Sequence, residues 1–207
     1  MALEIGTKQA EMFYKLSIAA VQEMIFSVQE QSGTEVVPYW AVAEEESVDN
    51  PFWDSFTTIW TGDGGLGNRI FNVFDELFQQ YRNVIIIGSD SPQITSQYIL
   101  DAVNILDGGS ANGVIGPCED GGFVLFGSKI PVLKSLWTGI EYSKYNTLLQ
   151  LTEKLDNIGF TYDYLPIMSD VDNCSDLEKL YNVLKINSKC NLSKQNELMI
   201  WINSILA

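Results

Sequence analysis

The sequence predicts an α/β fold in which helices cover both faces of a mostly parallel sheet. Residues 84–87 are an unbroken run of β-branched residues between polar neighbours, which is typical of a strand covered on both faces. Helical and strand patterns alternate along the chain, as expected for a parallel sheet. Acidic turns follow strands at Asp90, at Asp120 and at Asp170 with Asp172. Ligands of open α/β sheets bind at such strand ends, so we expect the acidic turns to converge on one site.

The first half of the chain is expected to contain two helices and one strand before the buried central strand at 84–87. Its segments are helix 7–30, strand 34–42, an ambiguous aromatic segment 54–60, a glycine-rich turn 62–67 and helix 68–80. Pro38 places the strand at or near a sheet edge. Arg69 lies in the first helical turn, where the helix dipole disfavours a cation. We therefore expect an anionic partner for Arg69, either Asp63 or a ligand phosphate.

The second half repeats the pattern of strand, turn and helix. Its segments are helix 97–106, strands 113–117 and 123–127 on either side of the turn CEDGG, helix 141–155, strand 161–165, and helix 176–184. Ser175 or Asn173 is expected to cap the last of these helices. Each acidic turn also has a plain structural interpretation, since Asp90 suits a cap or a turn and Asp120 suits a hairpin.

Composition favours one globular domain in a reducing compartment. The 207 residues are 46% hydrophobic and carry no linker or repeat, which predicts one domain at 1–186 and a carboxyl-terminal extension at 187–207. We expect the extension to be helical, although its run 198–202 also suits a strand. The sequence shows no leader and no apolar run near the ~18 residues that span a bilayer, so we expect a soluble, cytoplasmic protein. Three widely spaced cysteines suit reduced thiols.

The net charge and the lack of histidine limit the partners and the catalytic groups that this chain can use. The net charge is −15 with two arginines, which argues against a surface that binds nucleic acid, and the lack of a bilayer-spanning apolar run argues against a membrane partner. The chain has no histidine, so carboxylates remain as the acid, base and metal-binding groups. Such hard oxygen ligands favour Mg²⁺, Mn²⁺ or Ca²⁺. Converging carboxylates would repel one another without a bound cation.

A family resemblance rests on five segments that occur in the family's order. They are GDGGLGNRI, VIIIGSDSPQI, GVIGPCEDGGFVLFG, IEYSKYNTLLQLTEKLDNIGF and LPIMSDVDNCSDLEKL, between Gly6 and Leu184. Together they resemble the radical-SAM/selenodomain-associated transferases, proteins with the GT-A-type nucleotide-diphospho-sugar transferase fold. The resemblance implies a metal-dependent transferase that takes a nucleoside-diphosphate-sugar donor and an unknown small acceptor. The family is also similar to guanylyltransferases, so a nucleotidyltransferase remains an alternative.

The resemblance also implies a set of site residues. Asp90, Asp170 and Asp172 correspond to metal-binding aspartates for Mg²⁺ or Mn²⁺, and Asp120 with Asp90 forms the expected catalytic pair. The expected substrate contacts are Arg69, Gly121, Gly122, Ser89, Ser91 and Ser143. Tyr142 replaces the family's usual tryptophan before Ser143.

One departure concerns the amino end. The family begins with a central strand and a basic loop resembling KxPxxGxVKTRL, and residues 1–6 contain neither. Either the gene start is placed too late, or the chain is a shortened, non-catalytic binding module. For the chain as given we expect weak binding of nucleoside diphosphates. The gap in the sheet could be closed if strand 34–42 paired directly with 84–87, if a second molecule of a homodimer supplied a strand, or if the carboxyl-terminal extension did so.

Overall fold

The computed structural model describes residues 5–169, 171, 173–188 and 190–206. The chain divides into two compact units, and each contains segments that are distant in sequence. The first unit comprises Met1–Glu35, Ile87–Leu100 and Met168–Ala207. The second comprises Val36–Ile86 and Asp101–Ile167.

The second unit carries the β-structure in two sheets. A two-stranded parallel sheet pairs β1 (Tyr39–Val42) with β2 (Thr57–Trp60). A four-stranded sheet has the order β3, β5, β4, β6, with bounds Val84–Ile87, Phe123–Ser128, Gly113–Pro117 and Tyr162–Tyr164. Strand β4 is antiparallel to β5 and parallel to β6. The sheet is therefore mixed around the β4–β5 hairpin.

Two expectations about the strand at 84–87 are wrong. Strand β3 has the predicted bounds, but it lies at the end of its sheet with β5 as its neighbour. Only Val84 is buried, and the three isoleucines that follow are partly exposed; no described strand flanks the other edge of β3. Direct pairing of β1 with β3 is also wrong, because β1 pairs with β2. A continuous β-branched run thus predicts a strand but does not fix the number of its neighbours.

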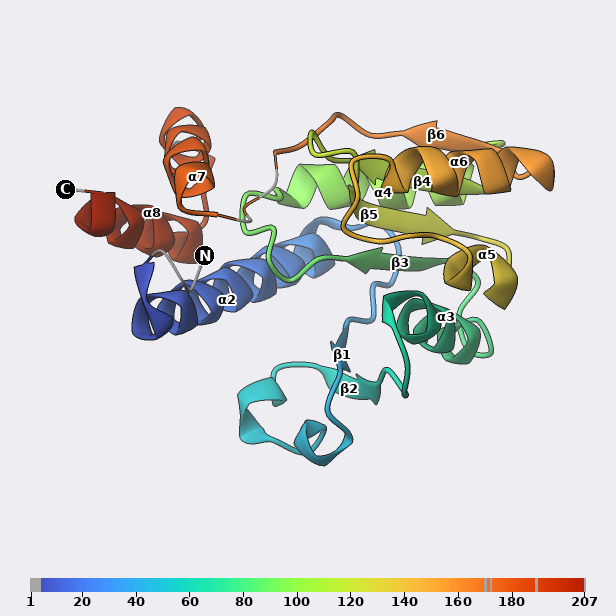
Figure 1. Cartoon of the computed structure of the whole chain (residues 1–207), viewed down its shortest axis with the longest axis horizontal. Helices are drawn as coiled ribbons and strands as arrows, with labels where there is room; N and C mark the ends of the chain where they lie inside the picture. Colours follow the sequence, from blue (N-terminus) through green and yellow to red (C-terminus); the bar gives the residue numbers. More distant parts are fainter. Residues whose placement is uncertain (1–4, 170, 172, 189, 207) are drawn as a thin grey trace. The chain divides into compact units, whose positions relative to one another are not determined.

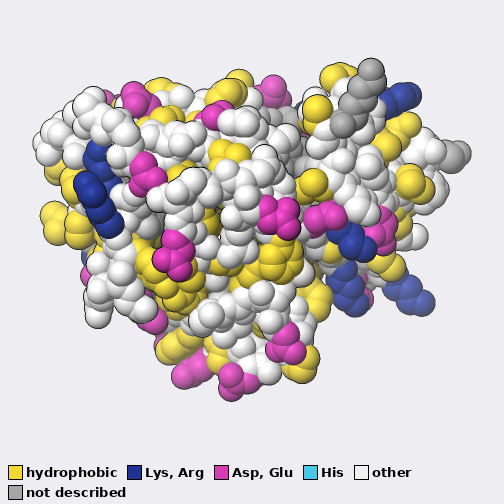
Figure 2. All heavy atoms as spheres, turned by 180° about the vertical axis from the view of Figure 1, so that it is seen from behind, with side chains coloured by type: hydrophobic (Ala, Val, Ile, Leu, Met, Phe, Trp, Pro, Cys, Tyr) yellow, Lys and Arg dark blue, Asp and Glu magenta, His cyan; other side chains and the backbone are white. Residues whose placement is uncertain are grey.

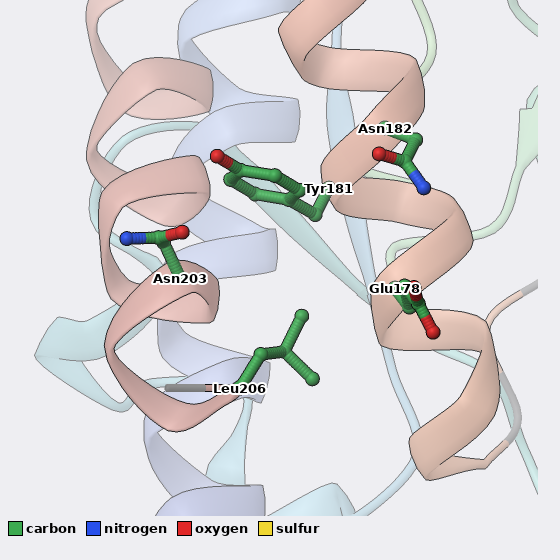
Figure 3. A pocket seen from close by; sticks show the side chains of 5 residues that line it. All are labelled: Glu178, Tyr181, Asn182, Asn203 and Leu206. Carbon is green, nitrogen blue, oxygen red and sulfur yellow. The ribbon is translucent and has the colours of Figure 1, made fainter.

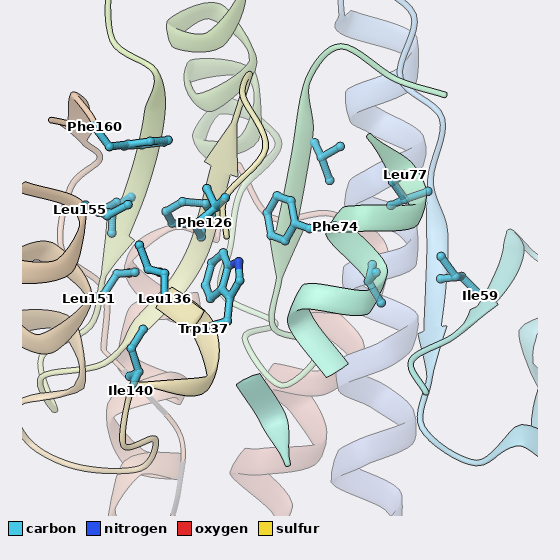
Figure 4. Close-up of a cluster of buried hydrophobic side chains, with 14 residues drawn as sticks. Ile59, Phe74, Leu77, Phe126, Leu136, Trp137, Ile140, Leu151, Leu155 and Phe160 are labelled. Carbon is cyan, nitrogen blue, oxygen red and sulfur yellow. The ribbon is translucent and has the colours of Figure 1, made fainter. Parts of the chain in front are cut away.

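Three helices pack in the second unit around an aromatic core. They are α3 (Leu66–Leu77), α5 (Lys134–Thr138) and α6 (Thr147–Asn157), and α5 contacts both of the others. The Trp137 ring is fully buried, stacks on Phe74 at 5.4 Å and meets Phe126 edge-on at 4.9 Å (Figure 4). Such offset and edge-on pairs add stability beyond the burial of apolar area. This core holds the short helix α5 against α3 and α6, just before the turn 141–146 in the chain.

Short elements complete the second unit and connect the two units. Two 3₁₀ helices, η1 (Glu45–Ser47) and η2 (Pro51–Trp53), separate β1 from β2. Helix α4 (Ser96–Gly108) begins in the first unit and ends in the second. The ambiguous aromatic segment 54–60 therefore resolves into a turn that follows η2 and the strand β2.

The first unit is mainly helical. In it α8 (Ser193–Leu206) lies between α2 (Thr7–Gln31) and α7 (Cys174–Ile186), as Figure 1 shows. Its core is rich in leucine; the buried members are Phe13, Val171, Leu177, Leu180, Leu184, Leu198 and Ile202. Of the two predicted caps, Asn173 caps α7, and Asp176 completes a capping box.

The surface reflects the composition. Figure 2 shows acidic side chains scattered over one face, while the basic side chains gather in separate places without a continuous basic surface between them. Among the described residues, no helix is long and apolar enough to cross a membrane.

Candidate functional site

The hairpin between β4 and β5 presents Asp120. The backbone N–H of Cys118 donates to Gly122 O at 3.0 Å, and the N–H of Gly121 donates to Cys118 O at 3.1 Å. Asp120 is exposed, and its Oδ1 accepts the N–H of Gly122 at 2.8 Å. The carboxylate is thus held by its own turn at the end of a strand.

Gly121 joins this hairpin to the segment before α6. Its φ of 89° lies in the left-handed region that favours glycine. A Cβ added at Gly121 would collide with the backbone carbonyl of Tyr145, and the N–H of Leu148 donates to Gly121 O at 2.7 Å. The glycine is therefore required both for its conformation and for the close approach of two backbones.

The segment 141–146 is a turn, and the predicted helix 141–155 begins only at Thr147 as α6. Thr147 is buried, and its hydroxyl donates to the carbonyl oxygens of Glu141 at 2.9 Å and Lys144 at 2.8 Å. The N–H of Lys144 donates back to this hydroxyl at 3.1 Å. These bonds to a threonine side chain offer the backbone an alternative to a further helical turn. Ser143, a predicted substrate contact, is exposed and has a φ of 56°.

Tyr142 connects this turn to the start of α3. Its hydroxyl donates to Trp137 O at 3.0 Å, and burial raises the pKa of the Tyr142 phenol well above its usual range. A Cβ at Gly67 would clash with the Trp137 carbonyl and lie 3.1 Å from the Tyr142 ring. The glycine-rich turn, the Tyr142 turn and the Asp120 hairpin therefore form one contiguous set of contacts.

Arg69 organises the glycine-rich turn through neutral acceptors. Its Nε donates to Gly64 O at 3.1 Å, and its Nη1 donates to Ala43 O and Thr61 Oγ1, both at 2.8 Å. Among the described residues no carboxylate forms an ion pair with Arg69, so the expectation of Asp63 as its partner is wrong. Its charge is therefore not neutralised by the described part of the chain.

The Asp90 loop belongs to the first unit. Asp90 is exposed, Ser89 is partly exposed, and Ser91 is buried with 1% of its surface accessible. Gln195 of α8 holds the loop, because its Nε2 donates to Pro92 O at 2.9 Å and to Ile94 O at 3.1 Å. The Asp90 turn is thus fixed by a buried amide side chain.

The predicted site residues fall into three groups. Arg69, Gly121, Gly122, Asp120 and Ser143 lie in the second unit on the contiguous set of turns, while Ser89, Asp90 and Ser91 lie in the first. Asp170 and Asp172 lie outside the described residues. The described part of the chain contains no group of three or more acidic or cysteine side chains placed to hold a metal. Convergence of the aspartates on one metal stays a prediction.

A pocket in the first unit lies apart from these predictions. It is formed by α7 and α8 (Figure 3), and its lining residues are Glu178, Tyr181, Asn182, Asn203 and Leu206. The predicted site residues do not line it.

The sequence reasoning missed three residues that the structure places in or around these turns. Thr147 fixes the turn before α6, Tyr145 packs its backbone on Gly121, and Gln195 holds the Asp90 loop. A polar residue inside an apparent helical pattern, such as Thr147, was the available signal for a helix start. Nothing in the local pattern around Gln195 indicates its contact with the loop after Asp90.

The central part of the chain matches a known protein family. Residues 24–144, more than half of the sequence, match the model of a family described as uncharacterised proteins conserved in bacteria (DUF2064). The chain belongs to this family. No protein of curated function matches the chain in sequence.

Two solved structures show the fold of this family member. The first is the crystal structure of a putative nucleotide-diphospho-sugar transferase from Desulfovibrio desulfuricans G20, with a TM-score of 0.79 and 22% identity. The match covers 99% of this chain and 89% of the chain in that crystal structure. The second is CMP:2-keto-3-deoxy-manno-octonic acid synthetase complexed with CTP, with a TM-score of 0.53, 11% identity, and coverage of 80% and 87%. The predicted α/β, nucleotide-diphospho-sugar transferase fold is confirmed.

Proposed function

We propose that this protein is a metal-dependent transferase that takes a nucleoside-diphosphate-sugar donor and a small acceptor in the cytoplasm. The observation that carries the proposal is that three turns contact one another. They are the glycine-rich turn, the Tyr142 turn and the Asp120 hairpin, and Tyr142 and Gly121 join them. They present an exposed carboxylate at Asp120 and a cation at Arg69 without a carboxylate partner in the described chain. The sequence resemblance to the radical-SAM/selenodomain-associated transferases and the fold of the two solved structures support it.

The metal is part of this proposal. The available donors are carboxylates in a chain without histidine, and this hard donor set suits Mg²⁺ or Mn²⁺. Asp90, Asp170 and Asp172 would hold the ion, which when bound neutralises charge on the diphosphate leaving group. Arg69 would add its charge to a phosphate near the α3 start, where backbone N–H groups also favour anions. Asp120 would act as the base or orienting group for the acceptor hydroxyl.

Two alternatives use the same scaffold. The likeness to the CTP-bound synthetase favours a nucleotidyltransferase, for which the guanylyltransferase type is our candidate. The second is a non-catalytic relative that binds its ligand without turnover. The products separate these activities, because a sugar transferase releases a nucleoside diphosphate and a nucleotidyltransferase releases pyrophosphate.

The deciding experiment compares donors and products. The purified chain is incubated with Mn²⁺ and panels of nucleotide-sugars and nucleoside triphosphates, and released nucleoside diphosphate and pyrophosphate are quantified. We expect nucleoside diphosphate from a nucleotide-sugar, and a loss of roughly 10²- to 10⁴-fold in Asp120→Asn if the carboxylate acts in proton transfer. Asp163→Asn is the matched control, because Asp163 is an exposed carboxylate on β6. Pyrophosphate release would support the nucleotidyltransferase, and binding without either product would support the binding module.

A further inference from the structure

We propose that the Tyr145 ring is a saccharide-contacting platform beside Asp120, a role that rests on the proposed function for its substrate class. Tyr145 is 86% exposed, more than any other large hydrophobic side chain described as exposed. Its backbone carbonyl nevertheless packs against Gly121 of the Asp120 turn. The ring is thus exposed while its own main chain is buried against the candidate site.

The turn that carries Tyr145 is held rigidly. The Thr147 hydroxyl ties Glu141 and Lys144 together, the Gln150 amide donates to Asn146 Oδ1 at 3.1 Å, and Gln150 Oε1 accepts the N–H of Glu141 at 3.0 Å. These bonds flank Tyr145 on both sides. A tyrosine has only two side-chain torsions, so a ring on a fixed backbone loses little conformational entropy on binding.

The turn contains two tyrosines, Tyr142 and Tyr145, and Ser143 lies between them with a positive φ. Among the described non-glycine residues, Ser143 alone has a positive φ. Tyr142 on one side of it is directed inward, with its hydroxyl on Trp137 O, while Tyr145 on the other side is exposed. The same turn therefore supplies one ring to the core and one ring to the solvent, the second from a residue whose carbonyl packs on Gly121, the neighbour of Asp120.

A saccharide fits this pairing of groups. The apolar face of a sugar ring packs on an aromatic face, and its hydroxyls donate to a carboxylate such as Asp120. The assignment applies where the group next to Asp120 is a sugar, either as the part transferred or as the acceptor.

The test uses saturation-transfer NMR and calorimetry on the full chain with Mn²⁺. The probes are free hexoses and sugar acids, nucleotide-sugars, and the matching nucleoside diphosphates. Tyr145→Ala is expected to weaken binding of the sugar-containing probes about tenfold, as for an aromatic contact worth ~1.4 kcal/mol, and to leave nucleoside diphosphates unchanged. Tyr145→Phe should bind as the unmodified chain does, because it keeps the ring. Tyr164→Ala, which removes a 53%-exposed ring from β6, is the matched control.

The outcomes separate this inference from the proposed function. Tyr145-dependent binding of free sugars, with no binding of any nucleotide, would refute the proposed transferase and support the platform. Binding of nucleotide-sugars that is equal in Tyr145→Ala and the unmodified chain would overturn the platform and leave the transferase intact. No binding of any saccharide, free or linked to a nucleotide, would also overturn the platform.

Discussion

The Asp120 turn of the second unit and the Asp90 loop of the first both follow a β-strand and both present an exposed aspartate. They are held by different means. The Asp120 turn depends on the absence of a side chain at Gly121, which lets two backbones meet. The Asp90 loop depends on the presence of a long side chain, the buried amide of Gln195. The Asp120 turn should therefore be destabilised by adding a side-chain atom at Gly121, and the Asp90 loop by removing the amide of Gln195.

Adding a methyl group at Gly121 should have the largest effect. Gly121→Ala forces an alanine to a φ of 89° and drives its Cβ into the Tyr145 carbonyl. We expect the free energy of unfolding to fall by roughly 3 to 5 kcal/mol, from backbone strain and overpacking together. Urea unfolding followed by tryptophan fluorescence measures it.

The control for this substitution is Gly108→Ala at the end of α4. A Cβ there meets no atom within 4 Å, and alanine is the better helix former by up to about 1 kcal/mol. Gly108→Ala should therefore cost nothing. Equal stability of Gly121→Ala and the unmodified chain would show that the turn relaxes without cost and that the close approach is not required.

The sequence predicted the two turns better than it predicted what holds them. Strands 84–87 and 113–117 had the right bounds because each is a short apolar run between turn residues. The place of β3 at a sheet end was missed because a side-chain pattern records burial, not the number of neighbouring strands. Arg69 was expected to pair with Asp63 or a ligand phosphate; within the described chain Ala43, 26 residues away, supplies a neutral acceptor that no local spacing indicates.

The same limit applies to the candidate site. The glycines at 121 and 122 and the carboxylate at 120 were visible as a motif. The role of Tyr145 was not, because an aromatic residue in a helical pattern is usually part of a core. Tyr145 is exposed in the turn before α6, and the Thr147 hydroxyl bonds to Glu141 O and Lys144 O in that turn.

Removing the amide of Gln195 should have the second largest effect. Gln195→Leu leaves the carbonyls of Pro92 and Ile94 without their donor and removes the acceptor of the Leu192 N–H, which lies 3.0 Å from Gln195 Oε1. We expect a loss of roughly 2 to 3 kcal/mol, because buried polar groups would be left unpaired. Native-state hydrogen exchange should show faster exchange of the Ile94 amide. The exposed Gln31→Leu is the control and should leave this exchange rate unchanged.

A test at high pH probes the Asp120 turn through Tyr142 and should give the smallest effect. Burial raises the pKa of Tyr142 above its ordinary value of 10.0, so the folded chain keeps this proton more tightly than the unfolded chain does. The resulting stability is fully present below pH 10 and is lost as pH rises through the folded pKa.

The unmodified chain should therefore lose stability between pH 9 and 11 more steeply than Tyr142→Phe, whose ring carries no titrating proton. At pH 7 the variant should be less stable by about 1 kcal/mol, the usual worth of the hydroxyl bond to Trp137 O. Tyr39 and Tyr162, whose pKa values are also raised, are present in both proteins, so the difference in slope isolates Tyr142. Parallel slopes in the two proteins would show that folding does not raise the pKa of Tyr142.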